Sequence, residues 1–105
     1  MSSETDIQNL IRIALSEKGI ISWRNNVGAL KDINGRLVRY GLCTGSSDII
    51  GIMPDGRFLA IEVKKPGKKP TAEQTRFIEA ILKHGGLAGV VRSVEELEYF
   101  LRSKE

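Results

Sequence analysis

The chain of 105 residues is long enough for one domain with a single hydrophobic core and too short for two, so we expect residues 1–105 to form one domain. Apolar residues make up 41% of the chain and charged residues 28%, as in a globular protein, and no apolar run approaches the roughly 20 residues of a membrane span. The single cysteine excludes an internal disulfide and a cysteine-based zinc site. We therefore expect a protein of the cell interior, in the cytoplasm or at the nucleoid, with no membrane partner.

The net charge of +3 is unevenly distributed along the chain. Residues 24–69 hold nine Lys or Arg against four Asp or Glu, whereas the segments before and after them each carry a net charge of −1. A basic central segment is expected in a protein that binds a polyanion such as DNA. A solvated charged surface would have the same composition.

The chain begins with a predicted amphipathic helix over residues 3–18, because apolar residues recur at helical spacing and a glycine follows. Glu4 lies on the buried face of this helix. It either complements the helix dipole or belongs to a functional site. Residues 20–26 are predicted to form a strand in which Trp23 anchors the core and Arg24 lies at the polar end.

A hairpin is predicted around Asn34-Gly35, a dipeptide that favours a tight turn between two strands. The arm carries Lys31, Arg36 and Arg39. These cations either lie along a phosphate backbone or keep an exposed hairpin soluble.

The central part of the sequence predicts two apolar strands, 48–53 and 57–64, joined by a turn at Asp55-Gly56. The remaining predicted elements are a stiff basic loop (65–70), a helix capped by Thr71 (71–84), a buried strand (87–91) and a final helix (to residue 102). The element order is therefore α-β-β-β-β-β-α-β-α, which predicts an α/β fold with a mixed sheet flanked by helices.

Three charged residues mark these central strands. Glu62 and Lys64 are two residues apart and so point to one face of their strand, and Asp48 is the other acid that hairpin pairing brings near. Charges at such a position are costly unless they are paired or bind a metal. Two carboxylates at a sheet edge are suited to a hard cation, with the lysine as a point charge beside it.

Asp48 followed by Glu62-Val63-Lys64 resembles the signature of the PD-(D/E)XK nuclease superfamily. More narrowly, the chain resembles a stand-alone VRR-NUC domain, similar to small nucleases of the Holliday-junction-resolvase type. The matching segments cover nearly the whole chain: Glu4, Tyr40-Gly41, residues 47–51, residues 58–64, Pro70-Thr71 with Gln74, and residues 85–94. One departure is Ser47, where the superfamily signature has proline.

The resemblance implies a restriction-endonuclease-like fold and metal-dependent hydrolysis of DNA phosphodiester bonds, most of all in branched DNA such as four-way junctions. It assigns catalytic roles to Glu4, Asp48, Glu62, Lys64 and Gln74, and Mg²⁺ or Mn²⁺ ligands to Asp48, Glu62 and the Val63 carbonyl. Arg24, Lys65, Lys68 and Lys69 are expected to contact flanking phosphates. Small junction-resolving members of the superfamily are homodimers, so we expect one here, with apolar surface from Leu37, Val38, Tyr40, Phe100 and Leu101.

Several alternatives remain open at the level of sequence. Gln74 has the spacing of a capping box with Thr71, which competes with its catalytic role. The substrate could instead be a flap, a nick or plain duplex. A branched-DNA binding module that does not cut, or a hydrolase of a small phosphate compound, would share part of the same pattern.

Overall fold

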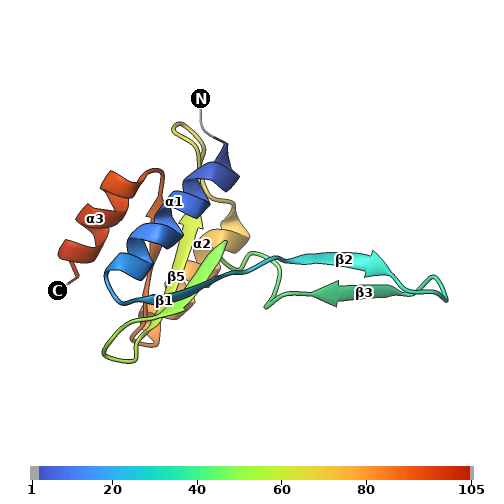
Figure 1. The fold of residues 1–105 in the computed structure, drawn as a ribbon. Coiled ribbons are helices and arrows are strands. Elements are labelled where there is room, and N and C mark those ends of the chain that lie inside the picture. Colours follow the sequence, from blue (N-terminus) through green and yellow to red (C-terminus); the bar gives the residue numbers. More distant parts are fainter. Residues whose placement is uncertain (1–2, 105) are drawn as a thin grey trace.

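The computed structural model describes residues 3–104 of the chain, and the predicted order of elements is confirmed (Figure 1). The helices and strands are α1 (Glu4–Glu17), β1 (Ile21–Arg24), β2 (Gly28–Lys31), β3 (Leu37–Tyr40), β4 (Ile49–Ile52), β5 (Phe58–Val63), α2 (Ala72–Lys83), β6 (Leu87–Val91) and α3 (Val94–Arg102). None of the helices within residues 3–104 is long and apolar enough to cross a membrane.

Helix boundaries follow the capping residues. Ser3 and Asp6 form a reciprocal capping box at α1, and Thr71 and Gln74 form another at α2. At α3, the Ser93 hydroxyl accepts a hydrogen bond from the backbone N–H of Glu96. Each cap satisfies backbone donors that the first turn of a helix leaves unpaired.

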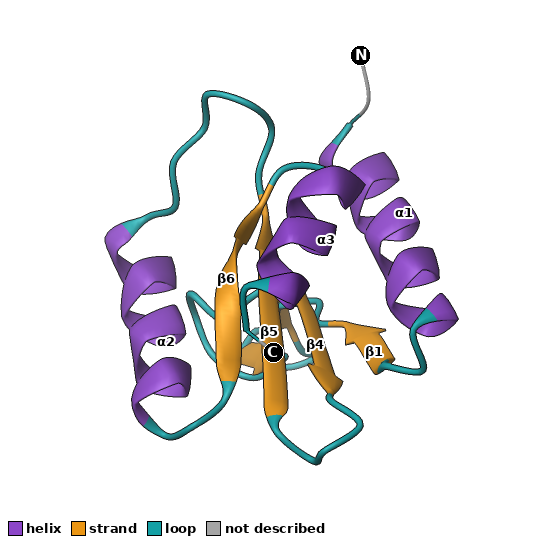
Figure 2. Cartoon of the chain, turned by 90° about the vertical axis from the view of Figure 1, so that its left-hand side faces the viewer, coloured by secondary structure: helices purple, strands orange, loops and turns teal. Residues whose placement is uncertain are grey.

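The main sheet is mixed and has the order β1-β4-β5-β6. The β1–β4 and β4–β5 pairs are antiparallel, whereas β6 returns after α2 and pairs with β5 in parallel. Figure 2 shows α1 and α3 on one side of this sheet and α2 on the other. The predicted mixed sheet flanked by helices is therefore present.

The hydrophobic core lies between the sheet and the α1–α3 pair. Its members are apolar residues that are almost wholly buried, and the largest of them are Ile11, Leu15, Ile49, Leu59, Ile61 and Leu97. The other face of the sheet is covered by α2 only over β5 and β6. The predicted burial of Trp23 is wrong, because this residue points from β1 to the face that α2 covers only over β5 and β6, and it is 48% exposed.

The strands β2 and β3 form a separate two-stranded sheet (Figure 1). This hairpin projects away from the main sheet, and every residue of β3 is exposed. It therefore adds no strand to the sheet that carries the acids. At its base, the Tyr40 ring lies across Gly28, where even a methyl group would collide with the ring.

Candidate active site

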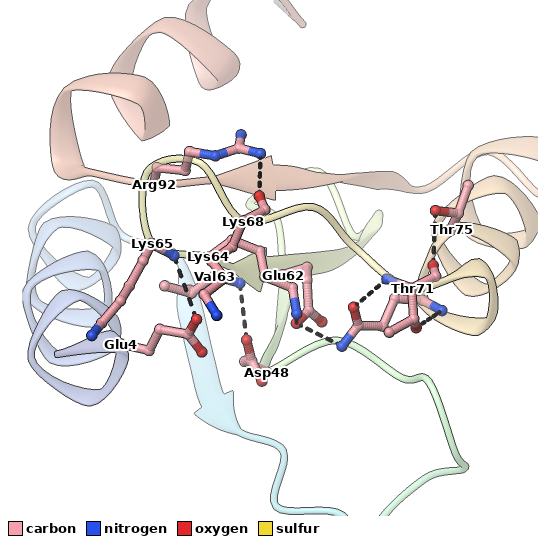
Figure 3. Close-up of polar contacts among 11 residues, drawn as sticks. Glu4, Asp48, Glu62, Val63, Lys64, Lys65, Lys68, Thr71, Thr75 and Arg92 are labelled. Atoms are coloured by element: carbon pink, nitrogen blue, oxygen red, sulfur yellow. Dashed lines mark hydrogen bonds and ion pairs between the residues drawn. The ribbon is translucent and has the colours of Figure 1, made fainter.

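Asp48 and Glu62 meet at one end of the two central strands (Figure 3). Ile49 pairs with Ile61, so the ladder continued by one residue places Asp48 opposite Glu62. Paired residues of neighbouring strands point to the same face of a sheet. The acids therefore share the face that α2 partly covers, opposite the face that holds the core.

Asp48 is fixed from two directions. Its Oδ2 atom accepts a hydrogen bond from the backbone N–H of Val63 (2.9 Å), and its backbone oxygen accepts one from the backbone N–H of Asn25 (2.7 Å). The side-chain amide of Asn25 also donates to Ser46 Oγ (2.7 Å) and to the Ser47 carbonyl (2.9 Å). Asn25 thus fixes the loop that positions Asp48, and no sequence pattern predicts this role.

The same loop packs closely against α2. Gly45 has a φ of +87°, and a Cβ atom there would lie 2.9 Å from the backbone of Glu73. Glycine is required both for this backbone conformation and for this close approach. The contact brings the loop before Asp48 to the helix that carries Gln74.

Glu62 is the most constrained group of the site. Its side chain is 2% exposed, and its Oε2 atom contacts Gln74 Nε2 (3.1 Å) and Lys64 Nζ (3.8 Å). Burial, together with the neighbouring Asp48 carboxylate, raises the pKa of Glu62 to about 8, although Lys64 acts in the opposite direction. Without further positive charge, the two acids do not both ionise readily near neutral pH.

Gln74 serves the helix cap and the acid at the same time. Its Oε1 atom accepts a hydrogen bond from the backbone N–H of Thr71 (2.8 Å), whereas its Nε2 atom donates to Glu62. The two roles that competed at the level of sequence therefore use opposite ends of one amide. The structure ties the first turn of α2 directly to the buried acid.

Glu4 reaches the site from the first turn of α1. Its Oε2 atom lies 3.4 Å from the backbone N–H of Lys65, and its charge contributes to the raised pKa of Glu62. Four of the predicted catalytic residues are thus gathered in one region of the molecule (Figure 3), namely Glu4, Asp48, Glu62 and Lys64. The fifth, Gln74, joins them through its hydrogen bond to Glu62.

The basic residues predicted to contact phosphates are spread around this region. Lys68 and Lys69 are exposed on the loop between β5 and α2. Arg92 holds this loop by donating from Nη2 to the Lys68 carbonyl (2.8 Å). Lys65 lies apart from the other two lysines and lines a cavity of about 530 Å³ between α1 and the start of α3. Arg24 lines a different hollow, next to Asp48.

The donor set suits a hard divalent cation. Glu62 Oε1 is buried and has no hydrogen-bond partner within residues 3–104, although Oε2 has two contacts. A cation near Glu62 and Asp48 would satisfy this oxygen and offset the repulsion between the acids. No three His, Cys, Asp or Glu side chains of residues 3–104 are grouped closely enough to hold a metal alone. Backbone oxygen, water or substrate oxygen would complete the coordination, as is usual for Mg²⁺.

A further residue at the edge of the site is Gln8, one turn after Glu4 on α1. Its side chain is only 9% exposed and lines the hollow beside Asp48. Sequence reasoning missed it, because it sits among the apolar residues of the helix without belonging to a motif. The one signal in the sequence was its i+4 spacing from Glu4, which places both side chains on one face.

The sheet order, the flanking helices and the acids with a lysine at the end of β5 define a nuclease fold of the PD-(D/E)XK type. The family model for the VRR-NUC domain matches residues 2–95, and the chain belongs to this family of DNA-hydrolysing nucleases. A solved structure described as a VRR_NUC domain is 23% identical, with a TM-score of 0.71 and full coverage of both chains. A comparison with curated proteins gave no match.

Proposed function

We propose that residues 1–105 act as one catalytic domain, an Mg²⁺- or Mn²⁺-dependent endonuclease that cuts branched DNA such as four-way junctions. The observation that carries the metal dependence is the pairing of Asp48 with a Glu62 whose pKa is raised to about 8. Such a pair is poised to accept a cation. DNA as a substrate favours the cytoplasm or the nucleoid as the site of action.

Each residue of the site has a role that its contacts support. Asp48, Glu62 and the Val63 carbonyl would hold the cation, which supplies Lewis-acid charge to the phosphoryl group and lowers the pKa of water. Lys64 would stabilise charge on the phosphorus oxygens or take part in proton transfer. Gln74 fixes Glu62 from α2, and Glu4 adds negative charge from α1.

The test is metal-dependent cleavage of three matched labelled DNAs: a four-way junction, a flap and a plain duplex. We expect cleavage only with Mg²⁺ or Mn²⁺, fastest on the junction, and none by Asp48→Ala. Binding of the junction without cleavage under every metal condition would indicate a non-cleaving module. Hydrolysis of a small phosphate ester in place of DNA would move the chain to another class of hydrolase.

The basic loop should contribute to DNA affinity without reading sequence. Replacing Lys65, Lys68 and Lys69 by alanine is expected to weaken binding of all DNAs and to flatten its salt dependence. On duplex DNA, the log–log slope should change by about 0.9 for each phosphate that the variant no longer neutralises. Fluorescence anisotropy across a salt series measures the slope, and the double variant Lys83→Ala/Lys104→Ala serves as a control elsewhere on the surface. An unchanged slope would place the three lysines outside the DNA-binding surface.

We further propose that the protein is a homodimer, which would match two active sites to the twofold symmetry of a junction. Exposed apolar residues support this: the row Ile21, Ile52 and Phe58 crosses three strands of the main sheet, and the projecting hairpin exposes Leu37 and Val38. Because an isolated two-stranded hairpin is only marginally stable, contact of the projecting hairpin with a second protomer would stabilise it. The predicted contribution of the final helix is wrong, because Phe100 packs against the core and Leu101 is buried within it.

Light scattering at micromolar concentration should give twice the chain mass of 11.6 kDa. Ile52→Lys, on the exposed row, should shift the protein to the monomer. Tyr99→Ser, at a residue of α3 that is 70% exposed, is the matched control and should remain dimeric. A monomeric wild-type protein, both free and on junction DNA, would contradict the dimer and favour a flap or nick substrate.

A further inference from the structure

A polar hollow of about 450 Å³ opens beside Asp48, between α1 and the base of the β2–β3 hairpin. Its lining is made mainly of polar side chains from segments far apart in the sequence: Gln8 from α1, Arg24 and Asn26 from the end of β1, and Tyr40 from β3. It is much larger than an ion needs. Its size is that of a ligand of roughly nucleotide dimensions, directly next to a proposed metal ligand.

Gln8 shows that the hollow is suited to a polar ligand. The residue is only 9% exposed, and its amide makes no side-chain hydrogen bond to another of residues 3–104. The buried polar atoms that lack a partner in residues 3–104 do not include the Gln8 amide, so this amide is open to water in the hollow, and a polar ligand there can take the place of that water. Gln8 offers both a donor and an acceptor, as the edge of a nucleobase does.

The other walls complete the fit to one nucleotide. Arg24 has no ion pair within the part of the chain that the structure describes, so its guanidinium is free to bind a phosphate. Tyr40 is 46% exposed and presents a flat aromatic surface on which a base can stack. Asn26 adds a second amide at the rim.

We propose that this hollow binds one unpaired nucleotide of the cut strand, next to the scissile phosphate; this role rests on the nuclease function proposed above. Arg24 takes its phosphate, Tyr40 stacks on its base, and Gln8 hydrogen-bonds the edge of the base. A base inside a duplex is paired and stacked on both sides, so it enters such a hollow only after leaving the stack. Branch points and flaps supply unpaired nucleotides without that cost, which gives the site a physical reason to prefer them.

The experiment is a double-mutant cycle between protein and DNA. Duplexes carrying one unpaired nucleotide on the cut strand are compared with the same duplexes in which that nucleotide is abasic, at each position flanking the cut. Dissociation constants are measured by fluorescence anisotropy with Ca²⁺ in place of Mg²⁺, so that the readout does not depend on cleavage. We expect removal of the base to weaken binding to wild-type protein about tenfold at one position, and Gln8→Ala to weaken binding of the intact DNA similarly.

The two effects should not add, because both remove the same interaction. Asn9→Ala, an exposed amide on the next position of α1, is the matched control and should keep the full sensitivity to the base. Val27→Trp places a large side chain in the hollow from its exposed rim and should have the same effect as Gln8→Ala. This second variant keeps the test valid if substitution of the buried Gln8 impairs folding. Fully paired duplex should bind equally well to all four proteins.

Equal affinity of wild-type protein for intact and abasic DNA at every position would overturn the proposal. The proposal would also be overturned if, for both Gln8→Ala and Val27→Trp, the fold-change in dissociation constant caused by the variant multiplied with the fold-change caused by removing the base. Cleavage in Mg²⁺ is followed separately on the same DNAs. Absence of cleavage together with a positive cycle would refute the nuclease proposal and leave the nucleotide site standing.

Discussion

Glu62→Ala and Lys64→Ala should each reduce cleavage of a labelled junction by at least about 10²- to 10³-fold, the scale of losing one group that acts on a charged transition state. Glu62 is expected to hold the cation, and Lys64 Nζ lies 3.8 Å from Glu62 Oε2 with its side chain only 15% exposed, so both charged groups belong to the same largely buried cluster. Single-turnover rates with excess enzyme separate this chemical step from product release. Circular dichroism and thermal melting establish that each variant is folded.

The matched control is Asp55→Ala, which removes an exposed acid from the turn between β4 and β5 and should cleave normally. Without divalent metal and above about pH 8, where Glu62 is ionised, Glu62→Ala should bind DNA at least as tightly as wild-type protein, since a negative charge facing phosphate has been removed. A folded Glu62→Ala protein that cuts at the wild-type rate would show that the active site has been assigned to the wrong residues.

A second large effect is expected in the stability of the metal-free protein as a function of pH. The folded pKa of Glu62, about 8, lies above the ordinary value of 4.5, so the folded protein binds this proton more tightly than the unfolded chain. The resulting stabilisation is present at pH 5 and is lost as the pH rises through 8. In chelator, the free energy of unfolding of the wild-type protein should fall by on the order of 4 kcal/mol between about pH 5 and about pH 9.

Glu62→Gln should remove most of this fall, because an amide keeps the hydrogen-bonding shape without a titrating charge. Glu73→Gln, at an exposed acid in the first turn of α2, should follow the wild-type profile. Mg²⁺ competes with the proton for Glu62, so its stabilising effect should be larger at pH 8 than at pH 5. Urea denaturation at each pH gives the profiles, and parallel curves for wild type and Glu62→Gln would contradict the raised pKa.

Local patterns in the sequence were sufficient for most of the fold. Alternation along the strand 57–64 placed Glu62 and Lys64 on one face, and the capping motifs at Ser3 and Thr71 fixed two helix starts. Each of these features is decided by residues a few positions apart. Strand alternation and helix capping are local features, so they can be predicted without knowing how the rest of the chain packs.

The misplaced and missed residues depended on long-range arrangement. Trp23 looks like a core residue in an apolar strand, but β1 is an edge strand, and α2 covers that face of the sheet only over β5 and β6. Asn25 and Gln8 belong to no motif, and their positions matter only once the loop before Asp48 and the hairpin base have come together. Spacing along the sequence does not show which polar side chains will line a hollow that forms between distant segments.

The hydrogen bond from the Val63 N–H to Asp48 makes correct pairing of β4 and β5 a condition for assembling the proposed active site. A slip of one residue between β4 and β5 would turn Glu62 toward Ile11 and Leu15 in the core and separate it from Gln74. A misaligned chain would thus bury a carboxylate among aliphatic side chains and also lose the proposed catalytic cluster. If the proposed active site is correct, molecules with the wrong strand register would be both less stable and unable to cut DNA.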